Sequence, residues 1–158
     1  MKKIFLPHGK YTIVDDEDFE WLNQWKWHCR GGYACRTINI KTDSGRRTTK
    51  YISMHREILG VAGRSEVDHR DLDKLNNTKS NLRVSSRSEN MMNQGVRKDN
   101  RSGYKGIRQT KYKTFEVRVC SKGKSIQVGT FRKLEDAIIA HSNAVKIYHG
   151  EFSRPNCI

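Results

Sequence analysis

The chain has 158 residues and a formal net charge of +14, with 35% hydrophobic and 30% charged residues. This length suits two or three small modules with small cores. No apolar run approaches the roughly 20 residues that span a bilayer, and Pro7 and His8 interrupt the apolar stretch near Met1, so we expect no membrane partner and no signal peptide. The distributed positive charge favours a nucleic-acid partner, because neutralising phosphates releases counterions.

Residues 1–53 predict a small β-rich extension. A strand at 10–14 precedes the acidic run 15–18. We interpret this run as the solvated start of a short helix, since carboxylates stabilise a helix N-terminus, and not as a metal site. Gly31-Gly32 predicts a hairpin turn between the two strands that follow.

Two tryptophans and two cysteines around this hairpin are expected to be structural. Trp25 and Trp27 recur at strand spacing, which is typical of core residues, although aromatics among basic residues can also stack on bases. Cys29 and Cys35 are too far apart for a zinc knuckle, and the other cysteines form no second pair. We therefore expect no zinc, and reduced thiols half-buried on a strand pair.

The stretch 65–94 has the pattern strand, loop, strand, helix. A polar loop at 70–80 separates two short apolar runs. Ser86 and Glu89 have the spacing of a capping box, which predicts a helix start. This order would bring a carboxylate, an imidazole and a carboxamide to the mouth of a small fold.

These side chains suit phosphodiester hydrolysis, which needs a divalent cation to stabilise charge on the phosphate and a base to activate water. Asp68 and an Asn carboxamide offer the oxygen ligands that Mg²⁺ prefers. His69 is adjacent to Asp68, so the strand must end and turn there for both side chains to reach one site. The alternative is turn chemistry without a metal.

In order and spacing, the stretch resembles the HNH nuclease family, with its ββα-metal fold, in the branch of phage and mobile-intron homing endonucleases. The matching pieces are Val67-Asp68-His69, Asn76-Asn77, Ser80-Asn81-Leu82-Arg83 and Ser88-Glu89-Asn90. The resemblance implies that His69 is the general base and that Asp68 and Asn90 hold Mg²⁺ or Mn²⁺. It also implies that Asn81 ties the loop to the strand.

Two further residues are candidates for supporting roles. Asn93 follows Asn90 by one helical turn, but the family's spacing from Asp68 favours Asn90. His55 lies in a short helix at 53–59, and it recurs at this position in the family, which suggests a place near the site. A satisfied, partly buried histidine is an equal alternative.

Residues 95–102 form a polar, basic linker, and residues 103–158, with a net charge of +7, predict a three-stranded antiparallel sheet packed on a helix at 133–149. The apolar stripe of this helix is expected to include Tyr148. Strand alternation leaves a basic sheet face opposite the helix. Such a face can lie in a major groove, although a merely solvated face is the alternative.

This module resembles the plant ethylene-response-factor (Apetala-type) DNA-binding domain over nearly its full length. The matching segments are 104–108, 115–118, 128–131, 135–137 and 148–150. That family reads DNA with its sheet, which implies contacts from Lys105, Arg108, Glu116, Arg118 and Gln127. The third strand departs from the family at Ser125 and Gln127, so the target sequence does not carry over.

The sequence thus predicts an α+β chain with a β-rich extension at 1–53, an HNH nuclease motif at 54–94, a linker at 95–102 and a DNA-binding domain at 103–158. We expect a metal-dependent hydrolase, a site-specific homing endonuclease that cuts double-stranded DNA in the host cytoplasm, with a monomer favoured. The alternatives are a non-catalytic DNA-binding regulator with a decayed nuclease motif and a nuclease without sequence preference.

Overall fold

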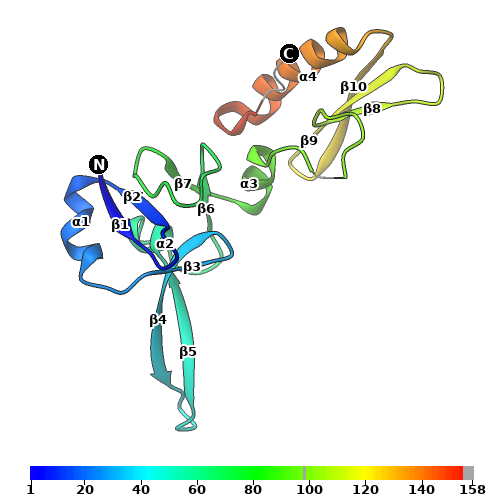
Figure 1. Cartoon of the computed structure of the whole chain (residues 1–158). Coiled ribbons are helices and arrows are strands. Elements are labelled where there is room, and N and C mark those ends of the chain that lie inside the picture. The colour runs from blue at the N-terminus through cyan, green and yellow to red at the C-terminus, as the bar shows by residue number, and fades with distance from the viewer. Residues whose placement is uncertain (98, 155–158) are drawn as a thin grey trace. The chain divides into compact units, whose positions relative to one another are not determined.

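The computed structural model describes residues 1–97 and 99–154, so Lys98 of the predicted linker and the C-terminal residues 155–158, including Cys157, lie outside the described residues. The described chain is mixed α+β, which confirms the predicted fold class, and it divides into two compact units, 1–85 and 86–158 (Figure 1). We call these unit 1 and unit 2. Within the described residues, each helix is too short or too polar to cross a bilayer.

Unit 1 consists of three small antiparallel sheets and two helices. Strands β1 and β2 pair with each other, β3, β4 and β5 form a sheet in that order, and β6 pairs with β7. The bounds are β1 Lys2–Phe5, β2 Tyr11–Val14, α1 Asp16–Asn23, β3 His28–Arg30, β4 Tyr33–Lys41, β5 Arg47–Ser53, α2 Met54–Ile58, β6 Glu66–His69 and β7 Leu82–Ser85.

The core of unit 1 brings the first sheet, α1 and α2 together, through Ile4, Leu6, Val14, Leu22, Trp27, Ala34 and Met54. Trp27 is buried as predicted, and its indole N–H donates to the Leu22 carbonyl at 2.8 Å. The prediction for Trp25 is wrong, because this side chain is 45% exposed. Strand β3 begins only at His28, so strand alternation does not apply to Trp25, which stacks instead under the Arg36 guanidinium at 4.3 Å.

The acidic run opens helix α1 as predicted, with three carboxylates in the first turn. It is not fully solvated, because Asp18 is buried and accepts a hydrogen bond from the Trp21 indole at 3.1 Å. Lys79, from the loop between β6 and β7, pairs with Glu17 at 2.6 Å and with Asp18 at 3.1 Å. The run therefore holds a loop of the central motif.

Strand β2 also binds this loop through its backbone. The Ile13 N–H donates to the Leu75 carbonyl at 2.9 Å, and the Asn77 N–H donates to the Ile13 carbonyl at 2.8 Å. The Lys79 N–H donates to the Asp15 carboxylate at 2.7 Å. The loop that follows His69 is thus fixed as an additional edge of the N-terminal hairpin.

Unit 2 begins with helix α3, whose start has the predicted capping box: the Ser86 hydroxyl accepts from the Glu89 N–H, and the Glu89 carboxylate accepts from the Ser86 N–H. Strands β8, β9 and β10 then form an antiparallel sheet with β9 in the centre. The bounds are α3 Arg87–Asn93, β8 Ile107–Gln109, β9 Phe115–Ser121, β10 Lys124–Phe131, α4 Leu134–His149 and a 3₁₀ turn at Gly150–Phe152.

The predicted sheet-on-helix packing is confirmed, since Ile107 and Val117 of the sheet pack against Ala137 and Ile138 of α4. The inclusion of Tyr148 in the buried stripe of α4 is wrong. Its side chain is 44% exposed, while its neighbour His149 is 8% exposed and bonds the Cys120 carbonyl at 3.0 Å.

Candidate active site

The His69 side chain lies at the end of β6 and is 5% exposed. Its Nε2 lies 3.2 Å from the Asn77 Oδ1, and the Asn77 Nδ2 donates to the Thr12 hydroxyl at 2.7 Å. The Thr12 hydroxyl in turn donates to the Leu75 carbonyl at 2.7 Å. Asn77 and Thr12 are fully buried. A continuous chain of hydrogen bonds therefore runs from β2 to the imidazole.

The direction of these bonds fixes which ring nitrogen carries the proton. The Leu75 carbonyl can only accept, so the Thr12 O–H must donate to it, and Thr12 then accepts from the Asn77 amide nitrogen. This turns the Asn77 carbonyl oxygen toward His69, so the His69 Nε2 must be protonated to donate to it. In the neutral ring, Nδ1 is the nitrogen with the lone pair.

His69 lies in a cluster of rings with His55 of α2 and Tyr33 of β4. Ring centroids are 5.2 Å apart for His55 and His69, and 5.9 Å for Tyr33 and His69. Burial lowers the pKa of His69 below its ordinary value, although the hydrogen bond with Asn77 and nearby carboxylates act in the opposite direction. The imidazole is therefore kept in its neutral, proton-accepting form near pH 7.

His55 is 8% exposed, and within the described residues its buried Nδ1 has no hydrogen-bond partner. Burial lowers the pKa of His55 to about 4, and the charges of His69 and Arg56 act in the same direction. His55 is thus neutral at physiological pH, and its ring packs beside that of His69.

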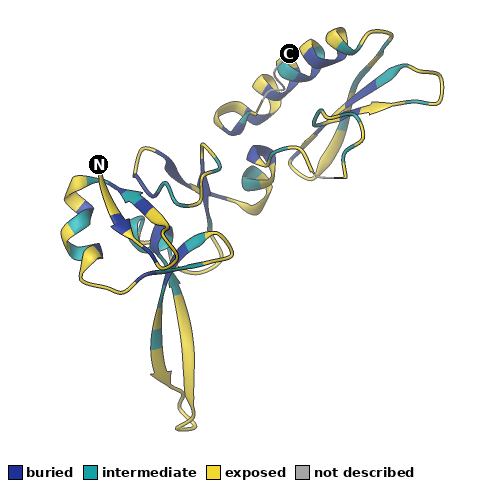
Figure 2. Ribbon diagram, viewed as in Figure 1, coloured by how far each residue is buried: buried dark blue, intermediate teal, exposed yellow. Residues whose placement is uncertain are grey.

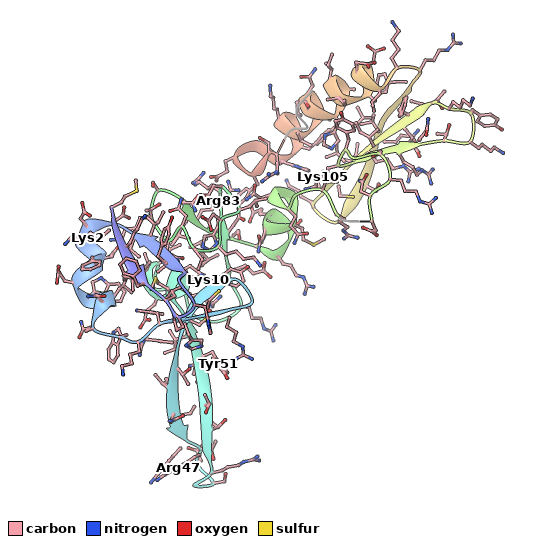
Figure 3. The ribbon with its side chains drawn as sticks, viewed as in Figure 1. Lys2, Lys10, Arg47, Tyr51, Arg83 and Lys105 are labelled. Atoms are coloured by element: carbon pink, nitrogen blue, oxygen red, sulfur yellow. The ribbon has the colours of Figure 1, made fainter. Side chains whose placement is uncertain are left out.

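Asp68, immediately before His69, has different partners. Its carboxylate is 3% exposed, and its Oδ2 accepts from the Arg83 guanidinium at 2.8 Å and 2.6 Å. Asp68 and Arg83 are directly paired across β6 and β7 (Arg83 is labelled in Figure 3). The buried carboxylate is thus held by a two-point contact with a cation of its own sheet.

Asn81 is the last residue of the loop that connects β6 to β7, and its side chain binds the start and the middle of this loop. Its Nδ2 donates to the Asp71 carboxylate at 2.9 Å and to the Asn76 carbonyl at 2.8 Å, while its Oδ1 accepts from the Asp71 N–H at 3.1 Å. Burial raises the pKa of Asp71, but the hydrogen bonds from Asn76, Asn81 and the Asp73 N–H outweigh it and leave that pKa below its ordinary value. Asn81 is therefore a brace for this loop.

Helix α3 carries the other two asparagines. Asn90 is half-buried and Asn93 is 4% exposed. Across the described part of the chain, there is no cluster of three or more His, Cys, Asp or Glu side chains that could hold a metal.

Four of the five predicted DNA contacts share one face of the unit 2 sheet. Arg108 pairs with Glu116 across β8 and β9, and Arg118 pairs with Gln127 across β9 and β10. The Glu116 carboxylate accepts from Arg108 at 2.7 Å and from Arg118 at 2.9 Å, and these hydrogen bonds, first that of Arg118, lower its pKa. Glu116 is enclosed, whereas the Arg108 and Arg118 side chains are 77% and 54% exposed.

Lys105 has a different environment from the other four. Its ammonium donates to the carbonyls of Met91, Met92 and Gln94, at 3.2 Å, 2.7 Å and 2.8 Å. It therefore satisfies the orphan carbonyls at the end of α3, and burial lowers its pKa. We leave Lys105 out of the proposed DNA contacts, because its donors bind the protein.

Reasoning from the sequence missed roles for Asn77 and Thr12. The Asn76-Asn77 pair contributes to the resemblance, but the sequence assigns no function to Asn77. Nothing in the spacing connects Thr12 to a residue 65 positions away. A polar residue at the centre of a short strand next to apolar neighbours was the available signal at Thr12.

Part of this region is similar to known proteins. Residues 63–92, from just before β6 to α3, match a family described as HNH endonuclease. Over 157 residues the chain is 27% identical to a protein of Acanthamoeba polyphaga mimivirus named "Uncharacterized HNH endonuclease L560", and the alignment covers 95% of this chain and 76% of that relative. Both comparisons support a DNA endonuclease in general.

Proposed function

We propose that the chain is a metal-dependent, site-specific DNA endonuclease of the homing type, in which His69 is the general base. The observation that carries this proposal is the oriented imidazole: within the segment similar to HNH endonucleases, a buried chain of hydrogen bonds requires the proton on Nε2, so Nδ1 carries the lone pair of the neutral ring. A base positioned in this way contributes about 10²–10⁴-fold to a hydrolysis rate.

The residues present fit a hard cation that keeps much of its hydration. Mg²⁺ is usually bound by one or two carboxylates together with water and substrate phosphates. Asp68 supplies one buried carboxylate, which two hydrogen bonds from Arg83 orient. We assign Asp68 and, from the resemblance, Asn90 as the residues that would hold Mg²⁺ or Mn²⁺. Such a cation supplies charge stabilisation at the scissile phosphate.

The roles of the remaining residues follow from their contacts. The His69 Nδ1 takes the proton from the attacking water, and the ring is held in place by Asn77 and flanked by His55. Asn81 braces the loop that follows His69, so that the imidazole is preorganised. Arg83 orients the Asp68 carboxylate and compensates its buried charge.

The unit 2 sheet is the proposed recognition surface for double-stranded DNA. Arg108 and Arg118 are fixed on either side of one carboxylate, with their exposed ends on the face opposite α4. Arginine is the most frequent reader of guanine in the major groove, and Gln suits adenine. We propose Arg108, Arg118 and Gln127 as base contacts and Glu116 as the residue that positions the two arginines.

The test is incubation of supercoiled and linear duplex DNA with the purified chain, with Mg²⁺ or Mn²⁺ or with EDTA, followed by mapping of the new ends. Cleavage at defined positions that EDTA abolishes, and that Asp68→Ala and His69→Ala lose while still binding the duplex, is the expected result. A shifted band without cut strands in either cation would show a DNA-binding regulator instead. Cleavage by His69→Ala at the wild-type rate would refute the catalytic assignment.

A further inference from the structure

The hairpin of β4 and β5 extends beyond the body of unit 1 as a two-stranded ribbon. Strand β3 pairs with β4 only at Tyr33, Ala34 and Cys35, and from Arg36 onward β4 pairs with β5 alone, as far as Lys41 and Arg47. Residues 39–51 are all exposed (Figure 2). We call residues 37–51 the arm; Figure 1 shows it projecting from unit 1, and Figure 3 shows Arg47 near its far end.

The arm is too exposed to be explained by stability. An isolated two-stranded hairpin is at best marginally stable in water, and the arm adds no residue to the core of unit 1. Exposed strand pairs of this length are also sites of unwanted pairing with other chains. An exposed ribbon of this kind presents two faces to a partner.

The two faces of the arm differ in chemistry. Directly paired residues lie on the same face of a sheet, and successive residues alternate. One face, here called the polar face, consists of Thr37, Asn39, Lys41, Arg47, Thr49 and Tyr51. The other face consists of Ile38, Ile40, Thr48 and Lys50. The polar face carries two cations and no carboxylate.

The base of the polar face adds a third cation. The Arg30 guanidinium stacks on the Tyr51 ring at 3.6 Å, and Tyr51 also contacts the His28 ring edge-on. Next along the face, the Thr49 hydroxyl donates to the Asn39 Oδ1 at 3.2 Å. Within residues 37–52, four basic side chains stand against one acidic side chain, Asp43 in the turn. The charge of this surface complements a polyanion.

We infer that the arm is a second DNA-binding element, which lays its polar face in the major groove of duplex DNA. The groove is about 12 Å wide and 8.5 Å deep and admits a two-stranded β-ribbon. From Thr37 to Lys41 the ribbon covers about 13 Å at about 3.3 Å per residue. Lys41 and Arg47 would contact phosphates or guanine, and Asn39 and Thr49 would face base edges.

The arm belongs to the same unit as the candidate base. The length of β4 therefore limits how far from the cut the arm can contact the DNA. Strand β4 begins at Tyr33, whose ring lies 5.9 Å from that of His69, and ends at Lys41. Eight residues of strand span at most about 26 Å, which corresponds to about 8 base pairs at 3.4 Å each. This inference rests on the proposed function for its substrate: the arm should protect the groove within about 8 base pairs of the cut.

The experiment measures the affinity of the full chain for a random-sequence 40-base-pair duplex in EDTA, over a range of salt concentrations. Each phosphate contact gives a slope of about 0.9 in log affinity against log salt, so its loss weakens binding about eightfold at 0.1 M salt relative to 1 M. We expect Lys41→Gln and Arg47→Gln each to weaken binding by about this factor, and the double variant about 60-fold. Lys50→Gln removes the same charge from the opposite face and should change binding less than about twofold.

Protection of guanine N7 from methylation by dimethyl sulfate then reports groove insertion directly, because N7 faces the major groove. Wild type should protect guanines near the cut, and Lys41→Gln/Arg47→Gln should lose that protection while its thermal melt is unchanged. Equal effects of Lys41→Gln and Lys50→Gln, or full protection by the double variant, would overturn the arm inference alone. A wild-type chain that binds no duplex would overturn both proposals, whereas binding through the arm without cleavage would refute only the endonuclease.

Discussion

The hydrogen-bond chain behind His69 makes Asn77 the most informative residue to change. Asn77→Ala removes the acceptor of the His69 Nε2–H, which lies 3.2 Å away in a buried site. A buried donor left without an acceptor costs about 1–3 kcal/mol. The ring can avoid this cost by turning or by moving its proton to Nδ1. The reactive arrangement, with the proton on Nε2, is then disfavoured by the same free energy. We therefore expect a cleavage rate about 5- to 150-fold lower.

The assay is single-turnover cleavage with enzyme in excess, in Mg²⁺ at pH 8, where the imidazole is neutral. Thr12→Val is the graded comparison: it keeps the Asn77 amide but removes the hydroxyl that orients it, so the loss should be smaller, about tenfold. Nitrogen-15 NMR of labelled histidine reports the tautomer independently. A wild-type His69 protonated at Nδ1, or Asn77→Ala cleaving within twofold of wild type, would refute this account of the base.

Three further predictions concern His69, His55 and Arg83 of unit 1. Since burial lowers the pKa of His69, the acid limb of its kcat/KM profile against pH should have its midpoint below 6.5, and a midpoint above 6.5 would contradict the assignment. His55 has a folded-state pKa of about 4 against 6.5 when exposed, so the unfolded chain binds its proton first as the pH falls. Its contribution to stability is complete above pH 6.5 and decreases by about 3 kcal/mol by pH 4. Urea denaturation should show that the free energy of unfolding depends less steeply on pH in His55→Gln than in the wild type. Arg83→Met leaves the buried Asp68 carboxylate without its cation and should lower the free energy of unfolding by about 3–5 kcal/mol, with Asp68→Asn in the same chain restoring part of it; a loss below 1 kcal/mol would show that the pair is not buried in solution.

Local patterns predicted most of the fold. The capping box of Ser86 and Glu89, the Gly31-Gly32 turn and the alternation in β9 each depend on interactions within a few residues, and the structure has all three. Trp25 failed because its pattern was assigned to a strand that begins three residues later, at His28. Tyr148 failed because one position of the apolar stripe of α4 is filled by His149 instead.

The site was predictable only as a set of residues. The order and spacing of Asp68, His69 and Asn81 predicted that these residues lie around one loop, but the surroundings of each side chain depend on contacts between distant segments. Strand adjacency predicted that Asp68 and His69 differ in direction, yet not that Arg83 would pair with the carboxylate. The hydrogen-bond partner of His69 was still harder to predict, because Asn77 is oriented by Thr12, which belongs to the N-terminal hairpin.

The docking of the loop on strand β2 limits how the segment similar to HNH endonucleases can be divided or transplanted. That segment starts at residue 63, but the backbone that holds the loop belongs to Ile13, and the hydroxyl that orients the Asn77 amide beside His69 belongs to Thr12. A fusion protein built from residues 63–92 alone would carry Asp68 and His69 without the backbone and the hydroxyl that hold the loop and the imidazole. The smallest portable unit of the candidate site therefore includes the first hairpin.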